Sequence, residues 1–462
     1  MFNTSLLLIA EEFLFYKEEK KVNKKVLIII LAAVVVIAAV CVGLLVDWTG
    51  SKSGSSIGVT DAKTPTTADQ ATLKFKSVVK EAESWDANSN VIVVGDNIYV
   101  GNGLAILKLD MQGEQVGEAT LTAGMSSFAP RIAYADGMLF AFVNDFTNGY
   151  IEAVDTATMQ TVWVSEGIEG MNGFSPITVS GDNLYIAVSG YDFENFVPTA
   201  GSVISMTIAD DDTGSADEVK PLSFAYSDGL AYYWNGIAIT ENNIAIVGSV
   251  EGDLQTIDAS TGAMIDSYNV GSKIATSITY VGGKAYFGTS AEFGAQGGLM
   301  SVDIAKDGSI KQASMQFCDL GAQTTTTPVI SGGRVYVGTG DFLGGAGFFV
   351  IDAETMTSVY SAQVPGVDNW SGDDIAISGV QGTPVVTTAY GDTYVYFSIN
   401  ALPGGITVLK DAKGQSAADI ASLFTPDTAD QNATSASIIA GDDGTLYYTN
   451  DSGFLFAIGS AD

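Results

Sequence analysis

Hydrophobic positions between residues 91 and 458 recur in one repeated pattern of short runs separated by turns. Each copy has a turn containing glycine or asparagine, a run in which aromatic or β-branched residues alternate with others, a second glycine-rich turn and a further run. The first turns of the eight copies are 95–97, 135–137, 181–183, 241–243, 282–284, 332–334, 391–393 and 442–444. A period of two predicts β-strands with one buried side, and the turn residues supply the positive φ that tight hairpins need. This stretch is therefore predicted to be a series of antiparallel hairpins.

The spacing of the copies indicates how the hairpins are arranged. Successive turns lie 40 to 60 residues apart, which matches the four-stranded blades of a β-propeller. We predict an all-β fold with an eight-bladed propeller. Seven blades is the alternative if one divergent copy is an insertion, and a long solenoid of hairpins is the competing architecture.

The two ends of the repeated region indicate how the ring closes. The last copy stops at residues 454–458, before an outer strand, whereas residues 72–79 form a lone strand pattern ahead of the first copy. Because an unpaired edge strand favours aggregation, we expect this N-terminal strand to complete the final blade. Leu73 and Phe75 are predicted to face inward, with Lys74 and Lys76 facing solvent.

Three copies also contain an aspartate followed three residues later by threonine. The positions are Asp155, Thr158 and Trp163; Asp258, Thr261 and Gly262; and Asp352, Thr355 and Tyr360. They resemble the Ala-x-Asp-x-x-Thr-Gly-x-x-x-Trp docking motif of quinoprotein-like (PQQ-type) propellers, with Met159 in place of the glycine and Tyr360 in place of the tryptophan. The resemblance covers about residues 72–460. It implies a structural role, in which the aspartate ties a turn together and the aromatic ring wedges between blades.

An uncharged run of 21 residues, 26–46, precedes the propeller. As a helix it is about 31 Å long, which matches the core of a bilayer. Five lysines flank its N-terminal end, and Asp47 and Trp48 follow it. The positive-inside rule then predicts a single-pass cell-membrane protein with a cytoplasmic tail, residues 1–25, and an extracytoplasmic propeller.

Alternatives remain for this N-terminal region. A cleaved signal peptide competes with the retained signal anchor, although the run is long for one. A lipoprotein site at Cys41 is disfavoured by Val40, and translation from Val22 would shorten the tail. Residues 47–71 are rich in serine, glycine and threonine and are predicted to be a flexible stalk, followed by the propeller domain 72–462.

Charge limits the partners of the propeller. The chain has 53 acidic and 20 basic residues, and four glutamates and five lysines precede the predicted span, so 49 acidic and 15 basic residues lie after it. A net charge of about −34 repels nucleic acids and anionic lipids. Nucleic acid is therefore excluded as a partner, and the predicted contact with the membrane is the single helix.

The chain contains no histidine and only two cysteines, Cys41 and Cys318. This composition excludes Ser-His-Asp and Cys-His catalysis, histidine-bound zinc and histidine-ligated haem. The resemblance implies that a quinoprotein dehydrogenase would hold its quinone beside an adjacent cysteine pair, with calcium, and this pair is missing. We expect no catalytic residue, no metal site and no cofactor, and keep PQQ with calcium as the alternative.

Aromatic residues in the predicted loops are the candidate binding residues. They are Tyr191, Phe193, Tyr232, Tyr233, Trp234, Phe342, Asp368 and Trp370. Loops held by rigid strands are a common place for binding, and the competing interpretation is that these rings seal gaps between blades. The family includes an outer-membrane assembly lipoprotein that binds protein partners through its loops. The expected function is therefore non-catalytic protein interaction, scaffolding or recognition of an unknown extracytoplasmic partner, with a PQQ-dependent oxidoreductase and a glycan-binding sensor as alternatives.

Overall fold

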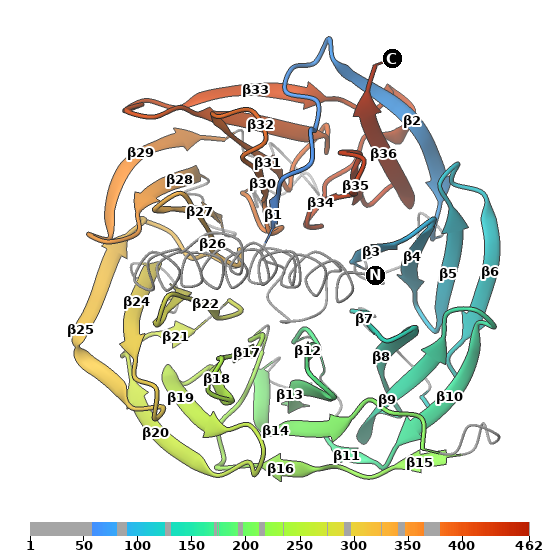
Figure 1. Cartoon of the computed structure of the whole chain (residues 1–462), viewed down its shortest axis with the longest axis vertical. Coiled ribbons are helices and arrows are strands. Elements are labelled where there is room, and N and C mark those ends of the chain that lie inside the picture. The colour runs from blue at the N-terminus through green and yellow to red at the C-terminus, as the bar shows by residue number, and fades with distance from the viewer. Residues whose placement is uncertain are drawn as a thin grey trace, which may run out of the picture. The chain divides into compact units, whose positions relative to one another are not determined.

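The chain forms eight β-sheets arranged around a common axis in a computed structural model (Figure 1). The structure describes residues 58–80, 90–124, 131–170, 173, 175–192, 197–211, 218–233, 235–274, 276–290, 297–324, 326–340, 347–364 and 379–461. The predicted all-β, eight-bladed propeller is confirmed, and the seven-bladed ring and the solenoid are wrong.

Each blade is built from four main strands, numbered from the axis outward. Blade 1 contains β3 (Val91–Val94), β4 (Asn97–Asn102), β5 (Ala105–Asp110) and β6 (Gln115–Thr120); blade 2 contains β7 (Ala133–Ala135), β8 (Met138–Asn144), β9 (Asn148–Asp155) and β10 (Gln160–Ser165). Blade 3 contains β12 (Thr178–Ser180), β13 (Asn183–Asp192), β14 (Val197–Thr207) and β16 (Phe224–Tyr226); blade 4 contains β17 (Ala238–Ile239), β18 (Ile244–Gly248), β19 (Asp253–Asp258) and β20 (Met264–Asn269).

The second half of the ring follows the same plan. Blade 5 contains β22 (Thr279–Val281), β23 (Lys284–Ser290), β24 (Gly298–Ile304) and β25 (Ile310–Asp319), with β21 (Lys273–Ile274) also pairing β23; blade 6 contains β26 (Val329–Ser331), β27 (Arg334–Thr339), β28 (Gly347–Asp352) and β29 (Thr357–Gln363). Blade 7 contains β30 (Val385–Thr387), β31 (Thr393–Ser398), β32 (Ile406–Asp411) and β33 (Asp419–Phe424); blade 8 contains β34 (Ile439–Ala440), β35 (Leu446–Thr449), β36 (Phe454–Ser460) and β2 (Ala71–Val78). Three short strands, β1 (Val59–Thr60), β11 (Ile168–Glu169) and β15 (Glu218–Lys220), and the 3-10 helix η1 (Thr428–Asp430) complete the described elements.

The N-terminal strand closes the ring, as predicted. β2 pairs antiparallel with β36 and forms the outer edge of blade 8. The predicted side-chain directions are wrong at Leu73, which is 38% exposed. A register shift between Leu73 and Phe75 leaves Lys74 as an extra residue, and a bulge of this kind reverses the alternation of faces. Phe75 is half-buried near Tyr447, with 6.4 Å between ring centroids.

The stalk, predicted to cover residues 47–71, was predicted to extend too far, because residues 58–66 pack against the ring. β1 lies near the axis in Figure 1 and pairs parallel with β30, and the chain then crosses to β2 at the rim. Blade 8 has no hairpin between its last two strands, since those strands come from opposite ends of the chain. The segment occupies that place: Thr64 is fully buried, and its Oγ1 lies 2.6 Å from the hydroxyl oxygen of Tyr396. Residues 47–57 lie outside the described residues.

The hairpin turns and the hydrophobic core both follow the repeat of the sequence. The turn residues Gly181, Asp136 and Asn243 have φ of 57°, 48° and 59°, in the left-handed region that the pattern predicted. The hydrophobic core lies mostly between blades, in clusters that each combine side chains of neighbouring sheets. We call each contact zone between two blades a seam. The ring is thus held together by its seams.

The predicted membrane span, residues 26–46, and the cytoplasmic tail lie outside the described residues. Within the part that the structure describes, no helix has both the length and the apolar character to cross a membrane.

Candidate functional site on the loop face

The aspartates of the docking motif each hold a tight turn between the third and fourth strands of a blade. Asp155 Oδ1 accepts hydrogen bonds from the backbone N–H and the hydroxyl of Thr158, both at 2.7 Å. Asp352 does the same with Thr355, at 2.8 and 2.9 Å. These bonds hold the pKa of both carboxyls below the ordinary value, with the Thr158 hydroxyl the largest cause for Asp155 and the Thr355 backbone N–H for Asp352.

The residue after the motif threonine takes a left-handed conformation in all three copies. Gly262 has φ of 73°, and the methionines at the equivalent positions, Met159 and Met356, have φ of 55° and 52°. A Cβ on Gly262 would lie 2.6 Å from the Phe224 ring, so that position needs glycine. The methionines have an unfavourable backbone but bury their side chains in neighbouring seams, which offsets the strain.

The last position of the motif reaches across a seam to the next blade. Trp163 is fully buried between blades 2 and 3, and its Nε1 donates to the carbonyl of Ile208 at 3.3 Å. In the second copy this position is Asp266, whose Oδ2 accepts from the N–H of Ile310 at 2.9 Å. The three copies therefore join blades with an indole, a carboxylate and, at Tyr360, a phenol.

Blades 6 and 7 meet at a buried carboxylate, Asp411. The hydroxyls of Tyr336 and Tyr360 donate to its two oxygens at 2.7 and 2.6 Å, and Arg334 Nε lies 3.7 Å from Oδ2. Burial is the main cause that raises the pKa of both tyrosines above the ordinary value, and the bond to Asp411 adds to it. This cluster joins blades 6 and 7 through one shared carboxylate.

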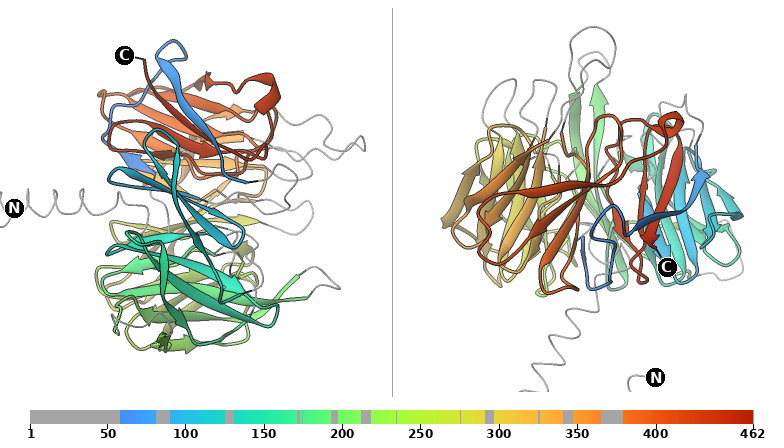
Figure 2. Two further views of the ribbon diagram at one scale, coloured as in Figure 1. Left: turned by 90° about the vertical axis from the view of Figure 1, so that its right-hand side faces the viewer. Right: turned by 90° about the horizontal axis from the view of Figure 1, so that it is seen from above.

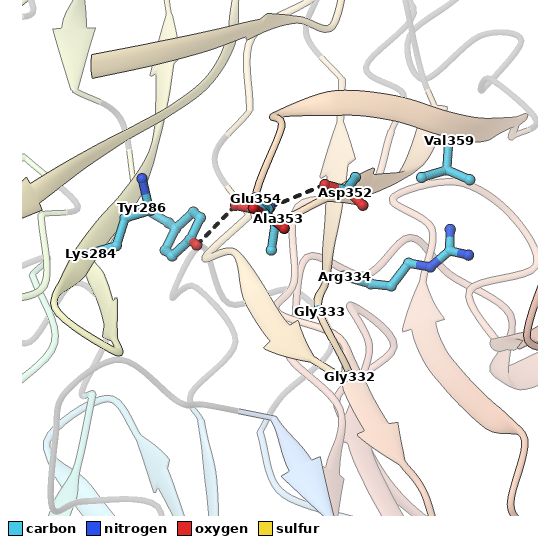
Figure 3. Close-up of a pocket in the computed structure, with 9 residues that line it drawn as sticks. All are labelled: Lys284, Tyr286, Gly332, Gly333, Arg334, Asp352, Ala353, Glu354 and Val359. Atoms are coloured by element: carbon cyan, nitrogen blue, oxygen red, sulfur yellow. Dashed lines mark hydrogen bonds between the residues drawn. The ribbon is translucent and has the colours of Figure 1, made fainter. Parts of the chain in front are cut away.

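A pocket of about 600 Å³ lies beside the seam of blades 5 and 6 (Figure 3). Its lining includes Lys284, Tyr286 and Arg334, and the Tyr286 hydroxyl donates to the carbonyl of Ala353 at 3.1 Å. The Arg334 guanidinium extends away from Tyr286 in Figure 3, and Lys284 Nζ pairs with Asp303 at 3.0 Å. Both cations are thus engaged with carboxylates, and the pocket belongs to the hairpin-turn side of the ring.

The opposite side, which we call the loop face, carries the loops between blades and between the second and third strands of each blade. One hairpin projects from it. β13 and β14 have 10 and 11 residues, whereas the second strands of the other blades have four to seven. Figure 2 shows these green strands rising above the ring in its right-hand view. We call residues 190–192 and 197–200, beyond the register shift after Ser189, the arm.

The arm extends beyond the strands that flank it in blade 3. β12 pairs with residues 183–185 of β13, and β16 pairs with residues 203–205 of β14. Val197 at the end of the arm is 47% exposed, and Tyr191 is half-buried. The arm therefore extends past its neighbours in the blade and carries an exposed apolar side chain at Val197.

Phe146, in the loop between β8 and β9 of blade 2, adds an aromatic ring to the same region. It is 51% exposed and has φ of 68°, a conformation that costs a bulky residue about 1–3 kcal/mol. The loop is fixed by Asp145 Oδ1, which accepts from the N–H groups of Thr147 and Asn148 at 2.9 and 2.7 Å. The fixed loop therefore leaves about half of the Phe146 side chain exposed to solvent.

β11 connects this loop to the base of the arm. Glu169 in β11 pairs with Asn148, and Gly170, which follows, lies against the carbonyl of Ser189. Sequence analysis did not identify Phe146, because a single phenylalanine between Asp145 and Thr147 gives no signal of strain or exposure.

The other residues that the sequence predicted to bind a partner and that the structure describes do not lie in the arm with Tyr191. Tyr232 is 1% exposed in the seam of blades 3 and 4, where its hydroxyl donates to Gln255 Oε1 at 3.0 Å, so its ring does not reach the surface. Tyr233 is half-buried, with Lys273 Nζ 5.3 Å from its ring centroid. Phe193, Trp234, Phe342, Asp368 and Trp370 lie outside the described residues.

The described residues contain no group of three or more cysteine, aspartate or glutamate side chains arranged to hold a metal ion. Cys318 is buried, and burial raises the pKa of its thiol.

Comparison with known proteins places the chain in a family. A family model described as "Outer membrane protein assembly factor BamB" matches residues 229–462, just over half of the chain. The chain belongs to this family. No curated protein matches the sequence.

Solved structures agree with the BamB-type propeller fold. BamB from Moraxella catarrhalis is 13% identical with a TM-score of 0.57, and the alignment covers 84% of this chain and 99% of that one. Quinohemoprotein alcohol dehydrogenase from Comamonas testosteroni is 12% identical with a TM-score of 0.58, covering 87% and 79%. The Dos1 propeller is 12% identical with a TM-score of 0.57, covering 85% and 95%. At these identities the likeness concerns the fold alone.

Proposed function

We propose that this chain is a membrane-anchored extracytoplasmic propeller that acts as a non-catalytic module for protein interaction, scaffolding or recognition. The observation that carries the proposal is the projecting arm of blade 3 together with the exposed Phe146 of blade 2. A projecting ribbon with exposed apolar side chains is suited to contact another macromolecule. Membership of a family named after an assembly factor supports the same function.

The sequence supports the anchored topology. The apolar run 26–46 has lysines on one flank, and residues 47–57 separate it from Gly58. Gly58 directly precedes β1, which lies near the axis in Figure 1. Eleven residues span at most about 40 Å when fully extended. The propeller is then held close to the outer surface of the membrane.

Protease treatment of intact cells tests the topology. We expect peptides from residues 72–462 to be released, while residues 1–25 stay protected inside the cell. Protection of the propeller in intact cells, with release only after lysis, would contradict the proposed location.

Substitution of the two aromatic residues tests the interaction. We expect Phe146→Ala with Tyr191→Ala to abolish recovery of the partner that cross-links to the wild type, with an unchanged melting temperature. Leu402→Ala, at a 61% exposed position on the loop face of blade 7, is the matched control. Equal recovery from all three proteins would place the contact elsewhere.

Two alternative functions predict other outcomes. A PQQ-dependent oxidoreductase would show a higher melting temperature and dye reduction after addition of PQQ and calcium, and a glycan sensor would bind a defined sugar on an array. We expect neither response from the purified propeller.

A further inference from the structure

The sequence distributes its charges unevenly around the ring. Residues 132–272, which contain blades 2, 3 and 4, carry 20 acidic residues and one basic residue, Lys220. Residues 273–462 carry 19 acidic and seven basic residues. The excess of acidic over basic residues is therefore 19 in the first stretch and 12 in the second, longer one. We call blades 2 to 4 the acidic arc.

The one basic side chain of the arc does not reach solvent. Lys220 is 0% exposed, and its Nζ bonds to Asp211 Oδ2 at 2.5 Å, to Glu218 Oε1 at 3.1 Å and to the carbonyl of Ala209. The same Nζ lies 5.7 Å from the centroid of the Trp163 ring. Its charge is thus used inside the protein, where it holds β15 against β10, and the surface of the arc between Arg131 and Lys273 has no basic side chain.

Acidic side chains of the arc lie on the loop face, in the arm and in the segments near it. Asp192 is part of the arm itself, and the others lie in β11 or in loops of blades 2 to 4: Asp145, Glu166, Glu169, Asp228 and Glu251. Glu166, Glu169, Asp228 and Glu251 are exposed. The exposed apolar side chains of Phe146 and Val197 therefore lie within a negatively charged surface. An apolar centre with a charged rim is the usual composition of a protein interface.

We infer that the loop face of blades 2 to 4 docks a basic extracytoplasmic protein, whose positive surface meets the acidic rim while an apolar site receives Phe146 and the arm. The inference rests on the proposed function and specifies where the partner binds and what charge it carries. Complementary charge steers association and excludes acidic partners. A second copy of this chain is not the expected partner, because the whole chain is strongly acidic and the arc would repel it.

The acidic arc has exposed carboxylates but no exposed amine, and this decides which cross-linking reagent is suitable. A carbodiimide couples a carboxylate directly to a lysine amine, so it is applied to intact cells that express the full chain. We expect links from Glu166, Glu169 and Glu251 to lysines of one partner, in a peptide of that partner with positive net charge. An amine-to-amine reagent is expected to give no link from the arc.

Matched variants measure the contribution of the charges. The set Glu166→Gln, Glu169→Gln and Glu251→Gln keeps the hydrogen-bond acceptors of these residues, including those that bind the N–H groups of Leu222 and Ala231. We expect it to lower the association rate of the identified partner about tenfold at low salt and to weaken the dependence of that rate on salt. The control set Glu118→Gln, Asp319→Asn and Asp427→Asn removes three exposed charges outside the arc and is expected to change the rate less than twofold.

The outcomes separate this inference from the proposed function. Links that arise from other blades, or a partner whose linked surface is acidic and whose association is insensitive to salt, would overturn the acidic arc and leave protein interaction intact. The absence of any link from the propeller to another protein would overturn both.

Discussion

The seam between blades 2 and 3 and the seam between blades 6 and 7 are closed by the same position of the repeat with opposite chemistry. Trp163 fills the first with an apolar ring that lies 5.7 Å from Phe140 between ring centroids. Tyr360 fills the second, but its hydroxyl joins Tyr336 and Arg334 at the carboxylate of Asp411. The comparison shows that the repeat specifies a place between blades rather than one kind of contact. The polar seam depends on the pairing of its two buried hydroxyls with the carboxylate.

Removal of the indole should have the largest effect on either seam. Trp163→Ala is expected to lower the free energy of unfolding by about 3–5 kcal/mol, because it leaves a large cavity between blades 2 and 3. Denaturant unfolding of the propeller measures the change, and Trp163→Phe, which keeps an aromatic ring, should lose less. A loss below about 1 kcal/mol for the alanine variant would show that this ring does not hold the seam.

Loss of the shared acceptor should come next. Asp411→Ala is expected to cost about 3 kcal/mol, because it leaves two buried hydroxyls and Arg334 without their acceptor. A variant that combines Asp411→Leu with Tyr336→Phe, Tyr360→Phe and Arg334→Met should regain most of the stability, since an apolar seam needs no partners. A combined variant no more stable than Asp411→Ala would contradict the comparison with the Trp163 seam.

Alkaline pH should weaken the seam of blades 6 and 7 but not the seam of blades 2 and 3, with Asp411 and Trp163 both unchanged. The folded pKa values of Tyr336 and Tyr360 are raised, and the unfolded value is about 10. Their contribution to the stability of the fold is therefore complete below about pH 10. It is lost as the pH rises above this value, because the unfolded chain releases the two protons and the folded chain keeps them. The free energy of unfolding, measured from pH 8 to 11, should decline less steeply with pH in the variant that combines Tyr336→Phe and Tyr360→Phe than in the wild type. Identical slopes would contradict the conclusion that these two tyrosines have raised pKa values in the folded seam.

The smallest loss of stability is expected at the seam between blades 7 and 8, where the ring closes. Thr64→Val removes the hydroxyl next to Tyr396 but keeps the shape of the side chain, so we expect a loss of about 1 kcal/mol. Thr66→Val, at a half-buried position of the same segment, should change stability by less. Equal effects at the two positions would show that residue 64 does not replace the missing hairpin.

The periodic part of the fold was predictable from the sequence. Eight turns in phase gave the eight blades, and the lone strand ahead of the first copy gave the closure, because both depend on local patterns. The direction of Leu73 was not predictable, since one extra residue at Lys74 reverses the faces and leaves no mark in the alternation. The stalk was overextended because its composition is that of a disordered segment, and its order comes from the place that blade 8 leaves open.

The tertiary contacts in and around the candidate site had little or no signal in the sequence. The polar stretch around Asp211 is typical of a solvated loop, yet it leads into β15, which pairs parallel with β10 and buries Lys220. Asp411 ends an ordinary strand of blade 7, and only its contact with blade 6 shows that it accepts hydrogen bonds from two tyrosines. The arm had a faint signal in the 60 residues between the turns at 181 and 241, the longest spacing of the series.

Site-specific photo-cross-linking in intact cells tests the central claim, that a partner protein docks on the loop face of blades 2 to 4. A photoreactive phenylalanine analogue is placed at Phe146 in one strain and at Leu402, on the loop face of blade 7, in another. The account predicts a single major adduct from position 146, reduced by Glu166→Gln, Glu169→Gln and Glu251→Gln, and little from position 402. Equal adducts from both positions, or an adduct from position 402 alone, would contradict it.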